Sequence, residues 1–245
     1  MSAAVRIALW SGPRNLSTAM MRAWGSRSDT TVVDEPLYAH YLKQTGAPHP
    51  GAAEVIAGQE SDLKRVTAGL LGPVPENRAI YYQKQMTHHL LPGMDLGWIA
   101  GLSNAFLIRE PASVVASFTK VAGEPRLEET GLPQQVELFL AEWHRTGRTP
   151  PVIDAADVLA APEMMLKKLC AQVGVSFDPA MLQWKSGPHA TDGIWARHWY
   201  ASVWTTTGFG KPSDQPPPEV PASFQGLLAE ARRLYGIMHA HRLRP

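Results

Sequence analysis

One segment near the N-terminus constrains the fold more than any other part of the chain. A short apolar run passes through a tight basic loop into a segment that opens with hydroxyl side chains, and it reads Ala8-Leu9-Trp10-Ser11-Gly12-Pro13-Arg14-Asn15-Leu16-Ser17-Thr18-Ala19-Met20. Backbone N–H groups of such a loop and of a first helical turn lack partners within the helix, and the helix dipole adds positive charge there. The segment predicts a strand, a loop that binds phosphate or sulfate, and a helix.

This loop differs from the phosphate loop of nucleoside triphosphatases. That loop, G-x-x-x-x-G-K-[ST], would place Gly, Lys and a hydroxyl residue where this chain has Ser17, Thr18 and Ala19. The second Gly, the Lys and the hydroxyl that binds Mg²⁺ are therefore missing, and the positive charge lies earlier, at Arg14. The pattern indicates an anion that is bound without a metal ion.

Short apolar runs alternate with helical patterns along the chain. Five runs are typical of strands, at residues 5–10, 31–34, 79–83, 105–108 and 151–154. The alternation predicts an α/β fold with a parallel sheet covered by helices on both faces. In such sheets ligands bind beyond the carboxyl ends of the strands. We expect one domain over residues 1–245.

Two stripes of apolar residues at helical spacing predict amphipathic helices. One stripe contains Val136, Phe139, Leu140 and Trp143, and a C-terminal stripe contains Phe224, Leu227, Leu228, Ala231, Tyr235 and Met238. The segments 44–58, 120–133 and 208–221 are rich in loop-forming residues and are expected to be loops.

Composition narrows the class of protein. The 23 basic and 22 acidic residues give a net charge of +1, so neither nucleic acid nor a membrane surface is indicated as a partner. The single cysteine, Cys170, excludes an internal disulfide and is expected in the core. The sequence shows neither a signal peptide nor an apolar run of about 20 residues. We therefore expect a cytoplasmic protein.

A second motif follows the fourth expected strand. The apolar run 105–108 ends in Arg109-Glu110-Pro111, and Ser117 comes eight residues after the arginine. Proline suits the first turn of a helix. Arg109 would provide a forked, permanently charged donor at the end of the strand, and Ser117 a hydroxyl from the helix that follows.

The two motifs together resemble those of sulfotransferases that use 3′-phosphoadenosine 5′-phosphosulfate (PAPS). The loop is similar to their 5′-phosphosulfate loop, Pro-Lys/Arg-Ser-Gly-Thr-Thr: Pro13 and Arg14 match it, and Ser17 and Thr18 take its two hydroxyl positions. Asn15 and Leu16 depart from the pattern. The Arg-x-Pro motif with its serine is similar to the family's 3′-phosphate motif. Asp34-Glu35-Pro36 and Trp199-Tyr200 resemble a bacterial and plant branch with sulfotransferase-like domains.

The resemblance implies a P-loop NTPase-like three-layer fold and transfer of a sulfuryl group from PAPS to a hydroxyl or amine of a small molecule, without a metal. A late Gly- and Lys-containing segment, here Gly210 and Lys211, covers the 3′-phosphate in the family. The residues that would bind PAPS are Gly12, Pro13, Arg14, Asn15, Leu16, Ser17, Thr18, Arg109, Ser117, Gly210 and Lys211.

Sulfuryl transfer needs a base for the acceptor proton and positive charge near the leaving oxygen. Arg14 can supply the charge, and Lys84 can complement it. Glu35 is one candidate base, because several sulfotransferase branches place a catalytic Glu at a similar point. His88, with His89 beside it, is the other, because the segment resembles a stretched Lys-x-His-Leu-Pro motif and an unperturbed His titrates near pH 6.5. The sequence leaves both open.

Two other functions fit the same features. A P-loop kinase with a degenerate phosphate loop would bind ATP with Mg²⁺, although the residues at positions 18 and 19 count against it. A module that binds the nucleotide without chemistry would be indifferent to the loss of Glu35 and His88.

Overall fold

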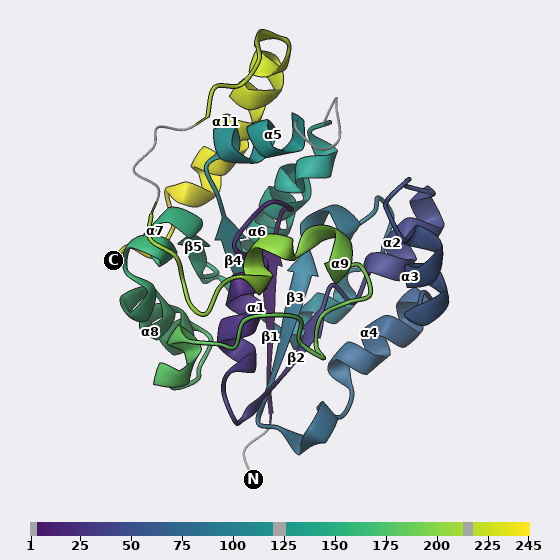
Figure 1. Cartoon of the computed structure of the whole chain (residues 1–245), viewed down its shortest axis with the longest axis vertical. Coiled ribbons are helices and arrows are strands. Elements are labelled where there is room, and N and C mark those ends of the chain that lie inside the picture. Colours follow the sequence, from purple (N-terminus) through teal and green to yellow (C-terminus); the bar gives the residue numbers. More distant parts are fainter. Residues whose placement is uncertain (1–3, 120–125, 213–217) are drawn as a thin grey trace.

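A five-stranded parallel sheet forms the centre of the molecule (Figure 1). The structure is a computed structural model, and it describes residues 4–119, 126–212 and 218–245. The strand order is β2-β3-β1-β4-β5, and every neighbouring pair is parallel. The strands are β1 (Val5–Ser11), β2 (Thr30–Asp34), β3 (Ile80–Met86), β4 (Ser103–Ile108) and β5 (Val152–Asp154).

Helices connect the strands and continue beyond β5. The α-helices of the described residues are α1 (Ser17–Gly25), α2 (Tyr38–Thr45), α3 (Ala52–Gly58), α4 (Leu63–Leu71), α5 (Pro111–Thr119), α6 (Leu132–Thr146), α7 (Ala155–Ala160), α8 (Pro162–Gln172), α9 (Ala196–Trp199), α10 (Ala201–Trp204) and α11 (Gln225–His239). Short 3₁₀ turns lie at Thr87–His89 and Glu128–Thr130.

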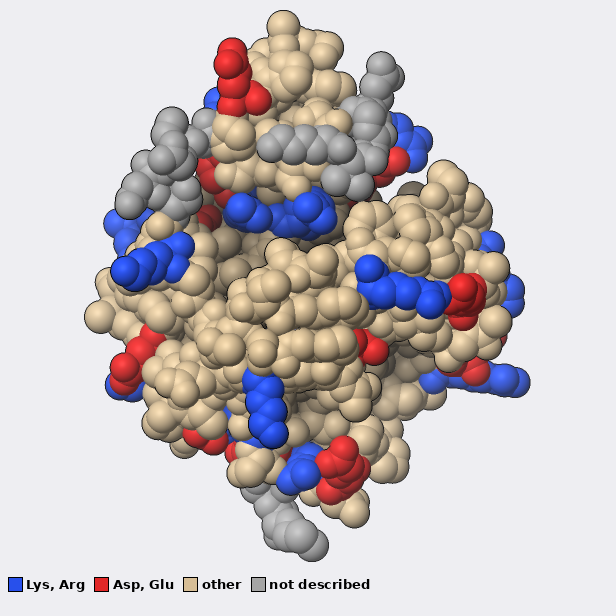
Figure 2. Space-filling view, viewed as in Figure 1, with Lys and Arg blue, Asp and Glu red and all other residues tan. Residues whose placement is uncertain are grey.

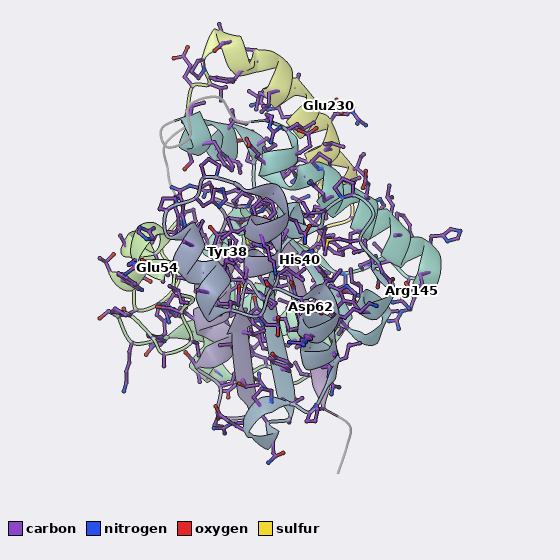
Figure 3. The ribbon with its side chains drawn as sticks, turned by 90° about the vertical axis from the view of Figure 1, so that its right-hand side faces the viewer. Tyr38, His40, Glu54, Asp62, Arg145 and Glu230 are labelled. Atoms are coloured by element: carbon purple, nitrogen blue, oxygen red, sulfur yellow. The ribbon has the colours of Figure 1, made fainter. Side chains whose placement is uncertain are left out.

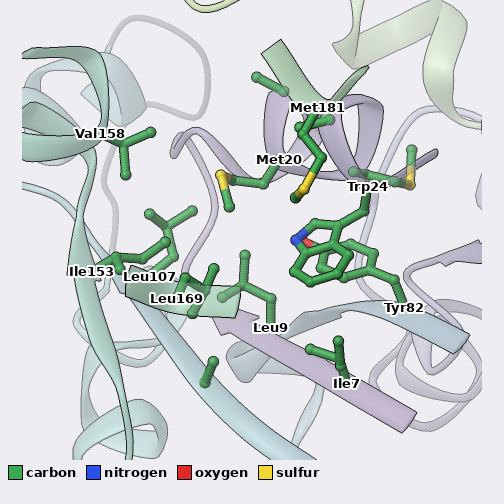
Figure 4. Close-up of a cluster of buried hydrophobic side chains, with 14 of the residues drawn as sticks. Ile7, Leu9, Met20, Trp24, Tyr82, Leu107, Ile153, Val158, Leu169 and Met181 are labelled. Atoms are coloured by element: carbon green, nitrogen blue, oxygen red, sulfur yellow. The ribbon is translucent and has the colours of Figure 1, made fainter. Parts of the chain in front are cut away.

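Side chains of β1 alternate between two apolar cores because successive strand residues point to opposite faces. Ile7 and Leu9 join the core that Figure 4 shows, with Met20 and Trp24 of α1 and with residues of α8. Ala8 and Trp10 face the other core, which α4, α6 and α11 cover. The sheet is therefore buried on both faces, as the α/β pattern predicts.

The structure confirms the expected α/β fold and differs from the sequence prediction in detail. All five strands are present, but β3 continues to Met86 through three buried polar residues, where a strand end was expected. The segment 44–58 is not wholly a loop, because it contains α3, which begins after Gly51 with φ of 74° and buries Val55. Leu140 is 45% exposed, so the buried stripe of α6 is narrower than predicted.

Cys170 is buried among apolar side chains of α8, as expected. Within residues 4–119, 126–212 and 218–245, every helix is too short or too polar to cross a membrane.

A buried ion pair ties the segment before α9 to α1. Arg22 of α1 lies 2.7 Å from a carboxylate oxygen of Asp192, and the two side chains are 1% and 5% exposed. The Trp204 indole N–H also donates to Asp192, at 3.0 Å. Removing one member of such a pair leaves the other charge buried without a partner, which is costly.

We predict that Asp192→Ala lowers the free energy of unfolding by about 3–5 kcal/mol. The exposed pair formed by Glu163 and Lys167 within α8 provides the control, because Glu163→Ala should change stability by less than about 0.5 kcal/mol. Urea unfolding of both variants measures the difference, and equal losses would contradict the role given to Asp192.

Candidate active site

The loop between β1 and α1 begins at Gly12 and is fastened to the end of β4. The Asn15 side-chain amide donates to the Leu107 carbonyl at 3.1 Å, and its oxygen accepts from the Leu16 N–H at 2.7 Å. Arg14 has φ of 57°, in the left-handed region, whereas Leu16 has φ of −82°. The unusual backbone conformation therefore falls on Arg14, and Leu16 fits the loop without strain.

Gly12 lies where the backbone of a distant segment approaches closely. A Cβ at this position would come 2.2 Å from the carbonyl oxygen of Thr130, so only glycine fits without movement. Gln135 of α6 reinforces this contact, because its side-chain amide donates to the carbonyls of Trp10 and Leu107 at 2.9 and 3.0 Å. A small pocket beside the loop is lined by Gly12, Pro13, Asn15, Arg109, Val114, Thr130, Leu132 and Gln135.

The structure brings the two sequence motifs together at one edge of the sheet. The Arg14 guanidinium donates to the Ser117 hydroxyl at 2.8 Å, and the Arg109 guanidinium donates to the Arg14 carbonyl at 2.8 Å. In Figure 2, basic side chains gather in a hollow below the end of the molecule that α5 and α11 form. Three residues predicted to bind one nucleotide are thus neighbours.

The electrostatics of this edge favour an anion. Partial desolvation and the nearby Arg14 charge lower the pKa of Arg109, although a guanidinium stays protonated. Among the described residues, neither Arg14 nor Arg109 forms an ion pair with an aspartate or a glutamate, so no carboxylate in direct contact neutralises either charge. Helix α1 has no side-chain cap, so the amides of its first turn are also available.

The structure does not join Gly210 and Lys211 to this edge. The adjoining Gly208 forms an antiparallel bridge with Gln183, and Phe209 packs edge-on against Trp184 with ring centroids 5.1 Å apart. Among the residues described, no hydrogen bond connects Gly210 or Lys211 to the loop. Their role at the 3′-phosphate stays a prediction.

Glu35 follows β2 and belongs to a buried polar network. Its backbone has φ of 41°, and one carboxylate oxygen, Oε1, accepts a hydrogen bond from Lys84 at 2.5 Å. Lys84, in β3, also donates to Asp34 at 2.9 Å and to the Tyr200 hydroxyl at 2.6 Å. The Tyr200 hydroxyl in turn donates to Asp34 at 2.7 Å. Two carboxylates, one ammonium and one phenol are therefore in direct contact.

Burial shifts the titration of this network. Desolvation raises the pKa of Glu35, and the Lys84 charge only partly opposes it. Burial favours loss of the Lys84 proton, but the carboxylates of Asp34 and Glu35 outweigh it and raise the pKa of Lys84 well above its usual value. Lys84 is thus held as a cation, and Glu35 has more basic character than an ordinary glutamate.

His88 and His89 lie in the turn that follows β3. In the part of the chain that the structure describes, Nδ1 of His88 and both ring nitrogens of His89 are buried without a hydrogen-bond partner. Burial lowers the pKa of His88 to about 3 and lowers that of His89 as well, so both rings are neutral near pH 7. His89 stacks on Tyr38 and Tyr41 of α2, and Tyr38 is labelled in Figure 3.

The order of the strands and the position of the β1–α1 loop define the fold class of this protein. A parallel sheet with strand order 2-3-1-4-5 and a basic loop between its central strand and α1 is the P-loop NTPase-like fold. The chain belongs to the sulfotransferase domain family, which matches residues 5–242.

Two curated relatives come from Arabidopsis thaliana and are named branched-chain-amino-acid aminotransferase-like proteins 1 and 2. They are 36% and 32% identical to this chain over 232 residues, which is 95% of the chain. The chain spans 41% of the length of each relative. The activity that their names suggest is therefore not carried over to this chain.

Solved sulfotransferases share the fold at low sequence identity. The sulfotransferase domain from the curacin biosynthetic pathway has 17% identity and a TM-score of 0.53, and the alignment covers 100% of both chains. A sulfotransferase from Alicyclobacillus acidocaldarius has 10% identity and a TM-score of 0.58, over 99% of this chain and 98% of that one. These similarities support a sulfotransferase fold.

Sequence reasoning missed several residues of the site. Thr130 and Gln135, which close the loop, carry no motif, and Tyr200 was noted only for its resemblance to a branch of the family. No sequence signal pointed to Tyr200, because only the structure shows that Lys84 lies in a strand whose residues are all buried, where its charge needs partners. No group of three or more metal-ligating side chains occurs among the described residues.

We predict that the neutral histidines make stability depend on pH. Both accept a proton in the unfolded chain near pH 6.5 but resist it when folded, so the free energy of unfolding falls as pH drops below that value. For His88 the loss is about 2 kcal/mol between about pH 7 and pH 5, and His89 adds a loss of the same sign. Urea unfolding at both pH values, on the wild type and on His89→Phe, measures it. The variant should show a weaker pH dependence than the wild type, and an unchanged dependence would show that His89 titrates normally.

Proposed function

We propose that this chain transfers a sulfuryl group from PAPS to a hydroxyl or amine of a small molecule, as one domain and without a metal ion. The observation that carries the proposal is the meeting of Arg14, Arg109 and Ser117 at the carboxyl ends of β1 and β4. Membership of the sulfotransferase family supports the transferred group.

The described residues fit a nucleotide with two separate anionic groups. The loop 12–16, through the N–H groups of Gly12, Arg14 and Asn15, would bind the 5′-phosphosulfate together with the Arg14 guanidinium and the first turn of α1, which carries Ser17 and Thr18. Arg109 and Ser117 would bind the 3′-phosphate, and Gly210 and Lys211 are proposed to contribute to the same group. A guanidinium suits this task because its fork matches the geometry of a phosphate.

The reaction needs one bond to form as another breaks. The acceptor oxygen or nitrogen attacks sulfur in line, the bond from sulfur to the bridging oxygen breaks, and that oxygen leaves with adenosine 3′,5′-bisphosphate. Arg14 and the loop amides stabilise the charge that develops on the leaving oxygen. The acceptor proton passes to a base.

Glu35 is the better candidate for that base. One of its oxygens is held by Lys84, no hydrogen bond reaches the other within the described chain, and the side chain keeps 11% of its surface exposed. Burial raises the pKa of Glu35 toward neutral pH, and a general base is most effective when its pKa lies near the working pH. His88, with a pKa of about 3, holds a proton weakly at neutral pH.

We predict that the chain releases adenosine 3′,5′-bisphosphate from PAPS in the presence of a suitable acceptor from a panel of alcohols, phenols and amines, with EDTA present. Glu35→Gln should lower kcat by about 10²- to 10⁴-fold, because it removes proton transfer while keeping shape. The affinity for adenosine 3′,5′-bisphosphate should stay within about twofold, because Glu35 lies outside the loop.

His88→Gln is the matched comparison. It should retain most of the turnover if Glu35 is the base, whereas loss in His88→Gln with retention in Glu35→Gln would assign the base to His88. If ATP with Mg²⁺ is the only nucleotide consumed, the chain is a kinase and the proposal is wrong. If PAPS binds but no acceptor in the panel is sulfated, and both variants bind as the wild type does, the chain is a nucleotide-binding module.

A further inference from the structure

The ammonium of Lys84 is completely satisfied by side chains of this chain. An ammonium has three N–H donors. Each has an acceptor here: Asp34 Oδ1 at 2.9 Å, Glu35 Oε1 at 2.5 Å and the Tyr200 hydroxyl at 2.6 Å. The Lys84 side chain is 2% exposed, so these three acceptors fix both its position and its charge.

Asp34 changes the charge balance around Glu35. If Glu35 were the only carboxylate beside Lys84, the two would form a neutral buried pair, and the ammonium would strongly favour the ionised carboxylate. Asp34 is a second carboxylate on the same ammonium, and its side chain is 2% exposed. The negative charge of Asp34 offsets part of the electrostatic stabilisation that Lys84 gives to the ionised form of Glu35. Glu35 therefore accepts a proton more readily.

Tyr200 determines how the network is arranged. Its hydroxyl accepts from Lys84, accepts from the Trp195 indole at 3.2 Å, and donates to Asp34 at 2.7 Å. The single hydroxyl proton is thus directed at Asp34, and Asp34 Oδ2 also accepts from the Gly193 N–H at 3.0 Å. The hydroxyl keeps Lys84 between the two carboxylates.

We propose that Asp34 and Tyr200 are positioning residues that hold the Lys84 ammonium against one oxygen of Glu35 and leave the second oxygen free to accept the proton of the acceptor. The inference rests on the proposed function only in making Glu35 the base. Among the described residues, no hydrogen bond joins Asp34 or Tyr200 to the loop between β1 and α1.

Four titratable groups face Glu35 from the elements packed around it. They are Asp34 on β2, Lys84 on β3, Tyr38 on α2, and Tyr200 between α9 and α10. Tyr38 and Tyr200 are both neutral near pH 7, because burial raises the pKa of each phenol. Among the described residues, Asp34 and Lys84 are therefore the acidic and basic side chains in direct contact with this part of the network beside Glu35.

The test titrates Glu35 directly, so it needs no acceptor. The full chain is labelled with ¹³C at the glutamate side-chain carboxyl, and the Glu35 resonance is the one missing from Glu35→Gln. Asp34→Asn should lower the midpoint of the Glu35 titration by one pH unit or more, because the whole Lys84 charge then acts on Glu35. Tyr200→Phe should instead raise it, because the variant loses the hydroxyl that donates to Asp34 and also lies near Glu35 Oε1.

Tyr235→Phe is the matched control. The Tyr235 hydroxyl also donates to a buried aspartate, Asp154, at 2.7 Å. Asp154 belongs to β5, which is the outermost strand on the opposite side of the sheet from β2. This variant loses the same kind of hydrogen bond and should leave the Glu35 midpoint unchanged. Binding of adenosine 3′,5′-bisphosphate should stay within twofold in all three variants.

A Glu35 midpoint that does not move in Asp34→Asn, or that moves equally in Tyr235→Phe, overturns the proposal. If Asp34→Asn fails to fold, Tyr200→Phe decides by the same criterion, and an unmoved midpoint there overturns it. The fate of the proposed function is measured separately: PAPS turnover that survives Glu35→Gln removes Glu35 from catalysis, whether or not its titration depends on Asp34.

Discussion

The parallel pairing of β1 with β3 and β4 is the constraint on which the site depends. Because parallel strands end at the same edge of a sheet, the loop after β1, the turn after β3 and the motif after β4 are brought together from positions far apart in the sequence. Glu35, at the end of β2, reaches the same edge through β3, where its N–H donates to the Lys84 carbonyl. The sheet therefore gathers Arg14, Arg109 and Glu35, to which the proposed function assigns anion binding and proton transfer.

Charge divides this edge into two parts with opposite character. Around β1 and β4, two guanidiniums lie close together and favour an anion. Around β2 and β3, two carboxylates share one buried ammonium, which favours proton uptake by the more exposed carboxylate, Glu35. Sulfuryl transfer needs both parts: the anionic donor needs positive charge, and the attacking nucleophile needs a base for its proton. In the proposed function, this separation would let one edge bind a doubly anionic nucleotide and still hold a base.

The sequence predicted the fold well because the fold depends on patterns that are local. Five apolar runs and two strand-loop-helix motifs sufficed for the sheet, and the family comparison confirms the sulfotransferase class. Long-range contacts were less accessible. No spacing rule connects Gly12 with Thr130, and nothing in the sequence says that the lysine at the expected end of β3 is surrounded by Tyr200 and two carboxylates. The neutral state of His88 likewise follows from burial, which the sequence does not show.

The proposed function depends above all on the binding of a bisphosphate nucleotide by the β1–α1 loop and Arg109 without a metal. Thermal unfolding with adenosine 3′,5′-bisphosphate and with ATP, each with Mg²⁺ and with EDTA, tests it most directly, since a ligand specific for the folded state adds about 2.7 kcal/mol at 100 times its Kd. We expect stabilisation by the bisphosphate in EDTA, and loss of this stabilisation in Arg109→Ala. Stabilisation by ATP alone, and only with Mg²⁺, would contradict it.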